Sequence, residues 1–405
     1  RVKIYLNGVD QSWTGSAPPQ NYANGAFNWS GTEVTTIGTR YRQGSYAGYY
    51  FDGYLAEVHF TDGTAYDADA FGEFKEGVWV AKAPSVTYGT NGFYLDFANS
   101  ADIGNDVSGE GNDWTPNNFT ASDVVLDSPT DNFCTLNPLD QTTIGTSGSY
   151  SEGNLKYVTS GNSTSNNGTR ATMAFNSGKW YWETLWASTP SSTYPQAGIL
   201  RSDTSLNSDT YGNALLSTGG YGVEGGGNKF INGSGSASGI SWSAGDIVQV
   251  AVDMDNGYIY IGKNGTWQFS GVPTSGASGT GALSSLGDYY YSPIAGDNNF
   301  VSAATIVLNF GQDSTFAGNT TAGGNSDANG RGDFKYTPPS GYLALSTANL
   351  PDPAIDPAQG SSPEDYFGVD LYTGTSATQE RSTLQFQPDL VWIKSRNFAT
   401  RHTLF

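Results

Sequence analysis

The segment Gly245–Trp267, GDIVQVAVDMDNGYIYIGKNGTW, constrains the fold of this chain more than any other stretch. From 247 to 254 the residues alternate with the period of two that is typical of a β-strand. Asn256-Gly257 predicts a two-residue type I′ hairpin turn, because both central residues of that turn need positive φ. Lys263-Asn264-Gly265 predicts a second turn, after which a third strand begins at Trp267. We therefore expect an antiparallel meander, which is typical of a binding sandwich rather than of an enzyme core.

The composition extends this expectation to the whole chain. The 405 residues include 53 Gly, and aromatic side chains make up 14% of them. Asn-Gly and Asp-Gly turn dipeptides recur along the chain, and few segments could carry a long helix. We expect an all-β protein built of tandem antiparallel β-sandwiches.

Charge and cysteine content exclude several classes of function. The formal net charge of −20 disfavours nucleic acid, whose phosphates need basic contacts, and it disfavours anionic membrane surfaces. No run of 18 apolar residues is present, so we expect no membrane insertion. The single cysteine, Cys134, allows no intrachain disulfide, and its apolar setting predicts a small buried side chain.

Four further segments accompany the meander in a recognisable order. They are Gly178–Glu183 (GKWYWE), Gly198-Ile199, Tyr221-Gly222 and Asn309–Gln312 (NFGQ), with Pro293 before the last of them. The combination resembles the SPRY domain, a bent antiparallel β-sandwich used for protein or ligand recognition. The resemblance covers residues 136–346. It implies that Trp180, Tyr181 and Trp182 belong to a core strand and not to a ligand site.

Residues 1–97 resemble the C-terminal part of a concanavalin A-like or laminin-G-like jelly roll. The segments that carry this resemblance are predicted strands at Val2–Asn7, Thr36–Gly38 and Phe51–Phe60. Asp67–Phe71 is expected to form one helical turn with Asp67 as its cap.

The remaining segments complete the expected domain order. Residues 98–135 form an ordered connector, residues 347–364 a Pro-rich, semi-rigid linker, and residues 365–405 the start of a third β domain with its best strand at Phe386–Arg396. Because the chain begins and ends within strand patterns, we expect it to be a fragment of a longer polypeptide. The order of segments resembles that of large structural proteins of bacterial viruses, especially marine and cyanobacterial ones. This resemblance implies a virion appendage such as a tail or head fibre, with homo-oligomers of three or more copies.

A search for catalytic and metal-binding groups finds no site. Glycan-cleaving jelly rolls carry an E-x-D-x-x-E spacing on one strand, which is absent here. The only histidines, His59 and His402, lie in different predicted domains, and Cys/His pairs for zinc are missing. We expect no enzyme and no cofactor, with one alternative left open: structural calcium at Asp62, Asp67 and Asp69. Asp253–Gly257 mimics part of a calcium loop, but hairpin-turn chemistry explains it better.

Two tyrosine-rich stretches are the candidate ligand-binding residues. The residues singled out are Tyr41, Arg42, Tyr46, Tyr49 and Tyr50 in the first stretch, and Tyr289 and Tyr290 in the second. Aromatic faces stack on sugar rings, and Tyr and Arg dominate binding hot spots. Contact with a glycan, contact between chains and packing in the protein's own core all remain open for them.

The expected function is adhesion from the virion surface, in the extracellular space, with a host cell-surface glycan or protein as partner. The alternative is a capsid- or tail-decorating protein that binds other virion proteins. A glycan-degrading enzyme is the third hypothesis, and no catalytic residues support it.

Overall fold

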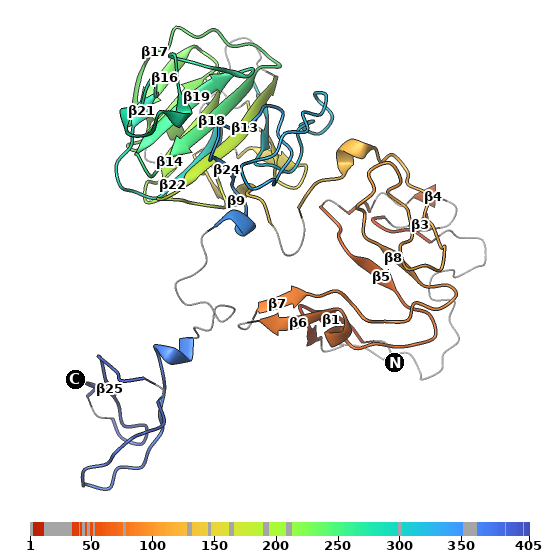
Figure 1. Ribbon diagram of the computed structural model, residues 1–405, viewed down its shortest axis with the longest axis vertical. Coiled ribbons are helices and arrows are strands. Elements are labelled where there is room, and N and C mark those ends of the chain that lie inside the picture. Colours follow the sequence, from red (N-terminus) through yellow and green to blue (C-terminus); the bar gives the residue numbers. More distant parts are fainter. Residues whose placement is uncertain are drawn as a thin grey trace. The chain divides into compact units, whose positions relative to one another are not determined.

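The computed structural model describes most of the chain (Figure 1). The described residues are 3–11, 35–39, 41–42, 45–46, 49–51, 53–75, 78–127, 132–144, 147–161, 166–188, 194–207, 213–298, 302–350, 363–384, 386–399 and 401–405. The chain divides into two compact units, Arg1–Asn349 and Leu350–Phe405. Strands dominate the first unit, and the second contains one short hairpin in its described residues. The helical elements that the structure describes are short 3-10 turns, which confirms the all-β prediction. None of these turns has the length and apolarity that a bilayer-spanning helix needs.

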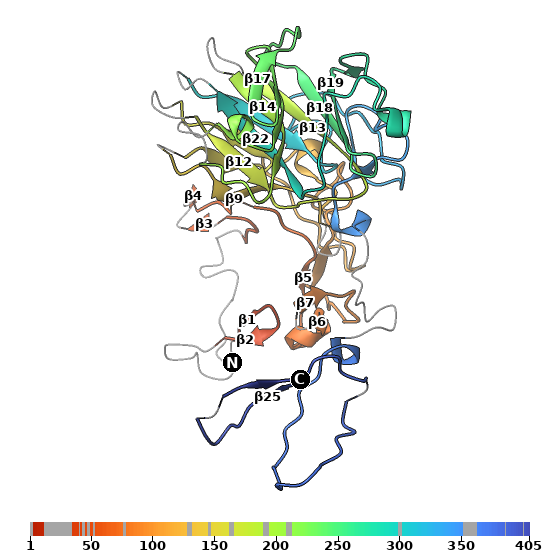
Figure 2. The same cartoon turned by 90° about the vertical axis from the view of Figure 1, so that its left-hand side faces the viewer.

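A β-sandwich of two sheets, antiparallel except for the parallel pairing of β24 with β13, lies within residues 136–344 (Figure 2). The first sheet has nine strands, in the order β10-β11-β23-β13-β18-β19-β20, with β21 paired to β19 and β24 paired to β13. Its strands are β10 (Ser149–Ser151), β11 (Lys156–Val158), β13 (Lys179–Ser188), β18 (Ile247–Asp253), β19 (Tyr258–Lys263), β20 (Thr266–Trp267), β21 (Ser284–Ser285), β23 (Thr305–Asn309) and β24 (Leu343–Ala344).

The second sheet has seven strands, in the order β17-β16-β15-β14-β22-β12-β9. Its strands are β9 (Leu136–Gln141), β12 (Gly168–Ala171), β14 (Tyr194–Arg201), β15 (Gly220–Glu224), β16 (Asn228–Ile231), β17 (Ser234–Ala237) and β22 (Tyr291–Asn298). The two sheets together confirm the predicted SPRY-like sandwich.

The predicted meander forms β18, β19 and β20, but its first turn differs from the prediction. Asp253 pairs with Tyr258, and of the loop residues between them only Gly257 has positive φ (72°). The two-residue type I′ prediction at Asn256-Gly257 is therefore wrong, because the Asp253 carboxylate accepts hydrogen bonds from Asn256 and closes a longer loop. The second turn has positive φ at both Asn264 (49°) and Gly265 (84°), as a type I′ turn requires.

Strand β13 presents two buried faces. Trp182 contacts Phe175 and Phe310 on the face toward the second sheet, whereas Tyr181 packs against Phe334 on the opposite face. Residues 311–349, which we call the covering segment, bury that opposite face. This arrangement confirms that the aromatic residues of the GKWYWE strand belong to the core.

The part of the chain before the sandwich forms two-stranded sheets in its described residues. They pair β1 (Tyr5–Leu6) with β2 (Val9–Asp10), β3 (Tyr41–Arg42) with β4 (Ser45–Tyr46), β5 (Val58–Phe60) with β8 (Phe93–Leu95), and β6 (Gly72–Lys75) with β7 (Val78–Ala81). The lectin-like jelly roll and the domain boundaries of the chain stay predictions.

Two strand predictions in this part are wrong. Residues 37–39 form a bend, with Gly38 at φ 79°, where a strand was expected at Thr36–Gly38. The strand expected at Phe51–Phe60 shrinks to β5, because Glu57 adopts positive φ (56°) and interrupts the extended chain. The strand predicted at Val2–Asn7 shortens to β1, because Lys3 and Ile4 precede the ladder and Asn7 begins a turn at positive φ (48°). Val2 lies outside the described residues.

A short helical turn lies between β5 and β6. The predicted turn at Asp67–Phe71 is confirmed as η1 (Ala68–Ala70), with Asp67 at the N-cap position but without a side-chain cap. The Asp67 carboxylate instead accepts hydrogen bonds from Lys3 and from the Tyr5 hydroxyl. Trp114, in the predicted connector, packs edge-on against Phe93 at 4.9 Å between ring centroids.

The second unit contains one hairpin, β25 (Trp392–Ile393) with β26 (Thr403–Leu404), in its described residues. The strand predicted at Phe386–Arg396 is thus much shorter than expected. Several large apolar side chains of the second unit are exposed, and they include Phe367, Trp392, Phe398 and Phe405. A strand whose apolar residues have nothing to pack against gains little from pairing, which explains the short ladder.

Candidate functional site

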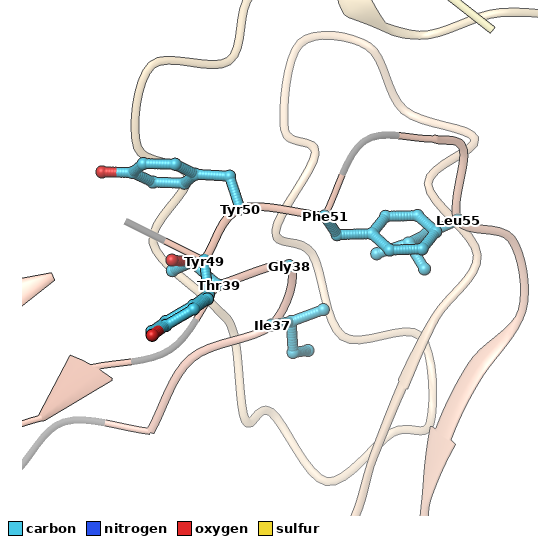
Figure 3. Close-up of a pocket in the computed structure, with 7 residues that line it drawn as sticks. All are labelled: Ile37, Gly38, Thr39, Tyr49, Tyr50, Phe51 and Leu55. Carbon is cyan, nitrogen blue, oxygen red and sulfur yellow. The ribbon is translucent and has the colours of Figure 1, made fainter. Parts of the chain in front are cut away.

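A hollow beside the predicted tyrosine stretch is lined by residues of the segments 37–39 and 49–55 (Figure 3). The Phe51 amide donates a hydrogen bond of 2.7 Å to the Gly38 carbonyl, which holds the two segments together. The hollow has a volume of about 520 Å³ and is shallow and wide open to solvent. We call it the aromatic hollow; its lining residues are Ile37, Gly38, Thr39, Tyr49, Tyr50, Phe51 and Leu55.

The side chains of the aromatic hollow are strongly exposed. Tyr49 and Tyr50 are each 69% exposed and Phe51 is 56% exposed, and Figure 3 shows the two tyrosine rings projecting away from the phenylalanine ring. An exposed aromatic cluster of this kind offers flat apolar faces and phenolic hydroxyls to a ligand. None of the lining residues carries a carboxylate, an imidazole, an amine or a thiol. The described lining residues are therefore suited to binding through ring stacking and hydroxyl hydrogen bonds.

The structure places the predicted site residues of the first stretch in two groups. Tyr49 and Tyr50 line the aromatic hollow. Tyr41, Arg42 and Tyr46 lie on the β3–β4 hairpin, where Tyr41 pairs with Tyr46. The side chains of that hairpin lie outside the described residues, so their role stays a prediction.

Tyr289 and Tyr290, the second predicted pair, lie on the sandwich just before β22. They are 45% and 58% exposed, whereas their neighbour Tyr291 is buried in the core. The Arg201 guanidinium lies 3.6 Å from the centre of the Tyr289 ring, in a cation–π contact. Arg201 is held there by two hydrogen bonds to Asp203 (3.0 and 2.6 Å). We call Arg201, Tyr289 and Tyr290 the tyrosine–arginine patch.

The electrostatics of this patch follow from one ion pair. The hydrogen bonds from Arg201 lower the pKa of the exposed Asp203 carboxyl, and the same bonds raise the pKa of Arg201. Because Asp203 balances the guanidinium charge, the patch offers an aromatic and weakly charged surface.

The sequence did not identify every residue of the aromatic hollow and of the tyrosine–arginine patch. Ile37 was expected in a strand, and Phe51 was assigned to the strand that follows the tyrosines, although it continues the aromatic run Tyr49-Tyr50-Phe51. Arg201 lies 88 positions before Tyr289, and only the pairing of β14 with β22, Arg201 opposite Tyr291, brings it close. No local pattern in the sequence could have identified that contact.

His59 occupies a structural position. Its Nδ1 lies 2.8 Å from the Tyr88 hydroxyl, its ring stacks on Tyr94 at 4.2 Å between centroids, and its Nε2 lies 3.6 Å from the Glu57 carboxylate. Burial lowers the pKa of His59, and Glu57 partly opposes that shift. These contacts support the structural role expected for this histidine.

The acidic residues proposed for calcium have other partners. Asp67 binds Lys3 and Tyr5, and Asp62 accepts a hydrogen bond from Asn91. Within the described residues no group of three His, Cys, Asp or Glu side chains is arranged to hold a metal ion. The Asp253 carboxylate accepts a hydrogen bond from the Asn256 amide within the β18–β19 loop, in agreement with the interpretation of Asp253–Gly257 as a turn.

Comparison with known proteins identifies two segments of the chain. Residues 179–284 match the family model of the SPRY domain, and residues 362–405 match a domain of unknown function (DUF7483). Among solved structures, the crystal structure of the SPRY domain of human HERC1 is similar, with 14% sequence identity and a TM-score of 0.33. That match covers 43% of this chain and 96% of the other. A search of curated proteins finds no match.

Proposed function

We propose that this chain is a non-enzymatic adhesion protein of a bacterial virus, which presents aromatic surfaces on β-sandwiches to a host-surface glycan or protein. The observation that carries the proposal is the exposure of Tyr49, Tyr50 and Phe51 around an open aromatic hollow. The SPRY segment supports it, because SPRY domains are interaction modules. The domain order, which resembles that of phage structural proteins, supports the virion location.

The binding mode follows from the shape of the surfaces. An open hollow and a small patch each supply a few stacking contacts, which give modest affinity at a single site. A homo-oligomer of three or more copies engages several ligands at once, and avidity then raises the overall affinity by orders of magnitude. We propose an extracellular location on the virion, and neither nucleic acid nor a membrane interior as partner.

The second candidate function is decoration of the capsid or tail through other virion proteins. The tyrosine–arginine patch favours it, because an arginine stacked on an exposed tyrosine is typical of protein–protein hot spots.

One experiment separates the two functions. The intact protein is applied to an array of bacterial surface polysaccharides, to an immobilised cyanobacterial outer-membrane extract, and to purified virions lacking this protein. The adhesion proposal expects retention on the array or the extract. Retention on virions alone would establish the decorating function, and release of reducing sugar from the array would establish an enzyme.

A further inference from the structure

Two side chains converge on the Asp253 carboxylate where β13 begins and β18 ends. Lys179 pairs in register with Asp253. The Asp253 Oδ2 atom accepts a hydrogen bond of 2.9 Å from the Lys179 Nζ and another of 2.9 Å from the Asn256 Nδ2. The Asn256 amide nitrogen also donates to Asp253 Oδ1, at 3.0 Å. An amine and a carboxamide are thus held on the same oxygen atom.

The surrounding chain fixes this arrangement. The Met254 amide donates to the Gly178 carbonyl (2.9 Å), and the Gly178 amide donates to Asp255 Oδ1 (2.8 Å). The start of β13 is therefore bound to the β18 loop next to the Lys179–Asp253 pair, through both backbone groups of Gly178. The Asp253 side chain is fully buried, and the Lys179 Nζ lies 6.0 Å from the centre of the buried Tyr342 ring. An apolar aromatic wall thus borders the three polar groups.

We propose that Lys179 and Asn256 form an intramolecular amide crosslink with loss of ammonia, assisted by Asp253. The Lys179 ammonium passes a proton to the Asp253 carboxylate, to which its Nζ is hydrogen-bonded at 2.9 Å. The neutral Nζ then attacks the Asn256 carboxamide carbon. The new C–Nζ bond forms and the C–Nδ2 bond breaks. Of the two protons that leave Nζ, one reaches Nδ2 through Asp253, and the other stays on Asp253 or departs with ammonia as ammonium.

The crosslink would stabilise the fold covalently, which the single cysteine of these 405 residues, Cys134, cannot do through an intrachain disulfide. A Lys179–Asn256 amide would join the two ends of a long loop that contains β13 to β18, and would restrict the unfolded chain as a disulfide does. This inference is independent of the proposed binding function.

A second reaction at Asn256 loses ammonia as well. Asn256 precedes Gly257, and the backbone nitrogen of Gly257 can close a succinimide ring on the Asn256 carboxamide without any lysine. The test therefore has to show which nitrogen is acylated.

The test is mass spectrometry of the purified full chain. We expect an intact mass about 17 Da below that of the unmodified sequence, the loss of one ammonia. Tryptic mapping should recover Lys179 and Asn256 in one branched peptide. In Lys179→Arg, which keeps the ion pair to Asp253 but offers no amine nucleophile, the full mass and two separate peptides should return. Separate peptides from the wild type, or an equal mass loss in Lys179→Arg, would overturn the proposal, and the latter result would identify the succinimide.

Discussion

Glu183 lies fully buried in the middle of β13, where it fastens the covering segment to the first sheet. Its carboxylate accepts hydrogen bonds from the backbone amides of Lys335 (2.9 Å) and Tyr336 (2.7 Å) and from the Tyr181 hydroxyl (2.8 Å). Burial raises the pKa of Glu183 to about 7, although these hydrogen bonds oppose the shift. Burial likewise raises the pKa of Asp297 to about 6.

The raised pKa of Glu183 predicts a pH-dependent stability. A folded-state pKa above the unfolded value contributes stability that is present below the unfolded pKa and is lost as the pH rises through about 7. The contribution that is lost between pH 4.5 and pH 8 is about 3 kcal/mol. Urea unfolding across this range should show a shallower fall in Glu183→Gln than in the wild type. Parallel curves would show that Glu183 does not titrate in this way.

Cys134 supplies a second residue-scale test. Its thiol is completely buried, and burial raises its pKa to about 12. Because the thiolate is the reactive form, we expect a thiol reagent to label Cys134 at pH 8 only as fast as the sandwich opens. Labelling should accelerate steeply at the urea concentrations that unfold the protein. Rapid labelling of the native protein would mean that Cys134 is accessible.

At the scale of elements, the sequence predicts strands well where their side chains are buried and poorly where they are exposed. The alternation in β18 and the GKWYWE motif of β13 identify two core strands, because both faces of each are covered. The expected strand at Phe51–Phe60 has a similar pattern, yet only Val58–Phe60 pairs. The covering segment has no periodic pattern, and its contacts with Tyr181 and Glu183 are non-local, so the sequence did not reveal it.

The second turn of the meander is testable by substitution. Gly265→Ala should destabilise the protein by about 1–2 kcal/mol, since Gly265 has φ 84° and a side chain is strained there. A matched control is Gly235→Ala in the edge strand β17, where φ is not positive and the atoms nearest to the added Cβ belong to the Phe230 ring at 3.1 Å, as those nearest to a Cβ at Gly265 belong to the Tyr336 ring at 3.0 Å. Thermal unfolding should separate the two variants. Equal effects would argue against the type I′ geometry.

At the scale of the whole molecule, the sequence predicts the kind of protein better than its binding site. The all-β class and the SPRY-like sandwich followed from turn dipeptides and strand motifs, which are local patterns. The aromatic hollow depends on a hydrogen bond between Gly38 and Phe51, and the patch depends on the pairing of β14 with β22. Both depend on contacts between distant parts of the chain, which turns and periodicity do not encode.

The proposed function requires that the exposed aromatic residues bind the ligand. The direct measurement is the affinity of the full chain for an immobilised cyanobacterial outer-membrane extract. The variants are Tyr49→Ala with Tyr50→Ala, Tyr289→Ala with Tyr290→Ala, and the control Phe119→Ala, which removes a ring of the connector that is 60% exposed. We predict at least a roughly tenfold loss of affinity for the Tyr49/Tyr50 variant, equivalent to about 1.4 kcal/mol, and no loss for the control. Unchanged binding by both double-tyrosine variants, or no binding by the wild type, would contradict the proposed function.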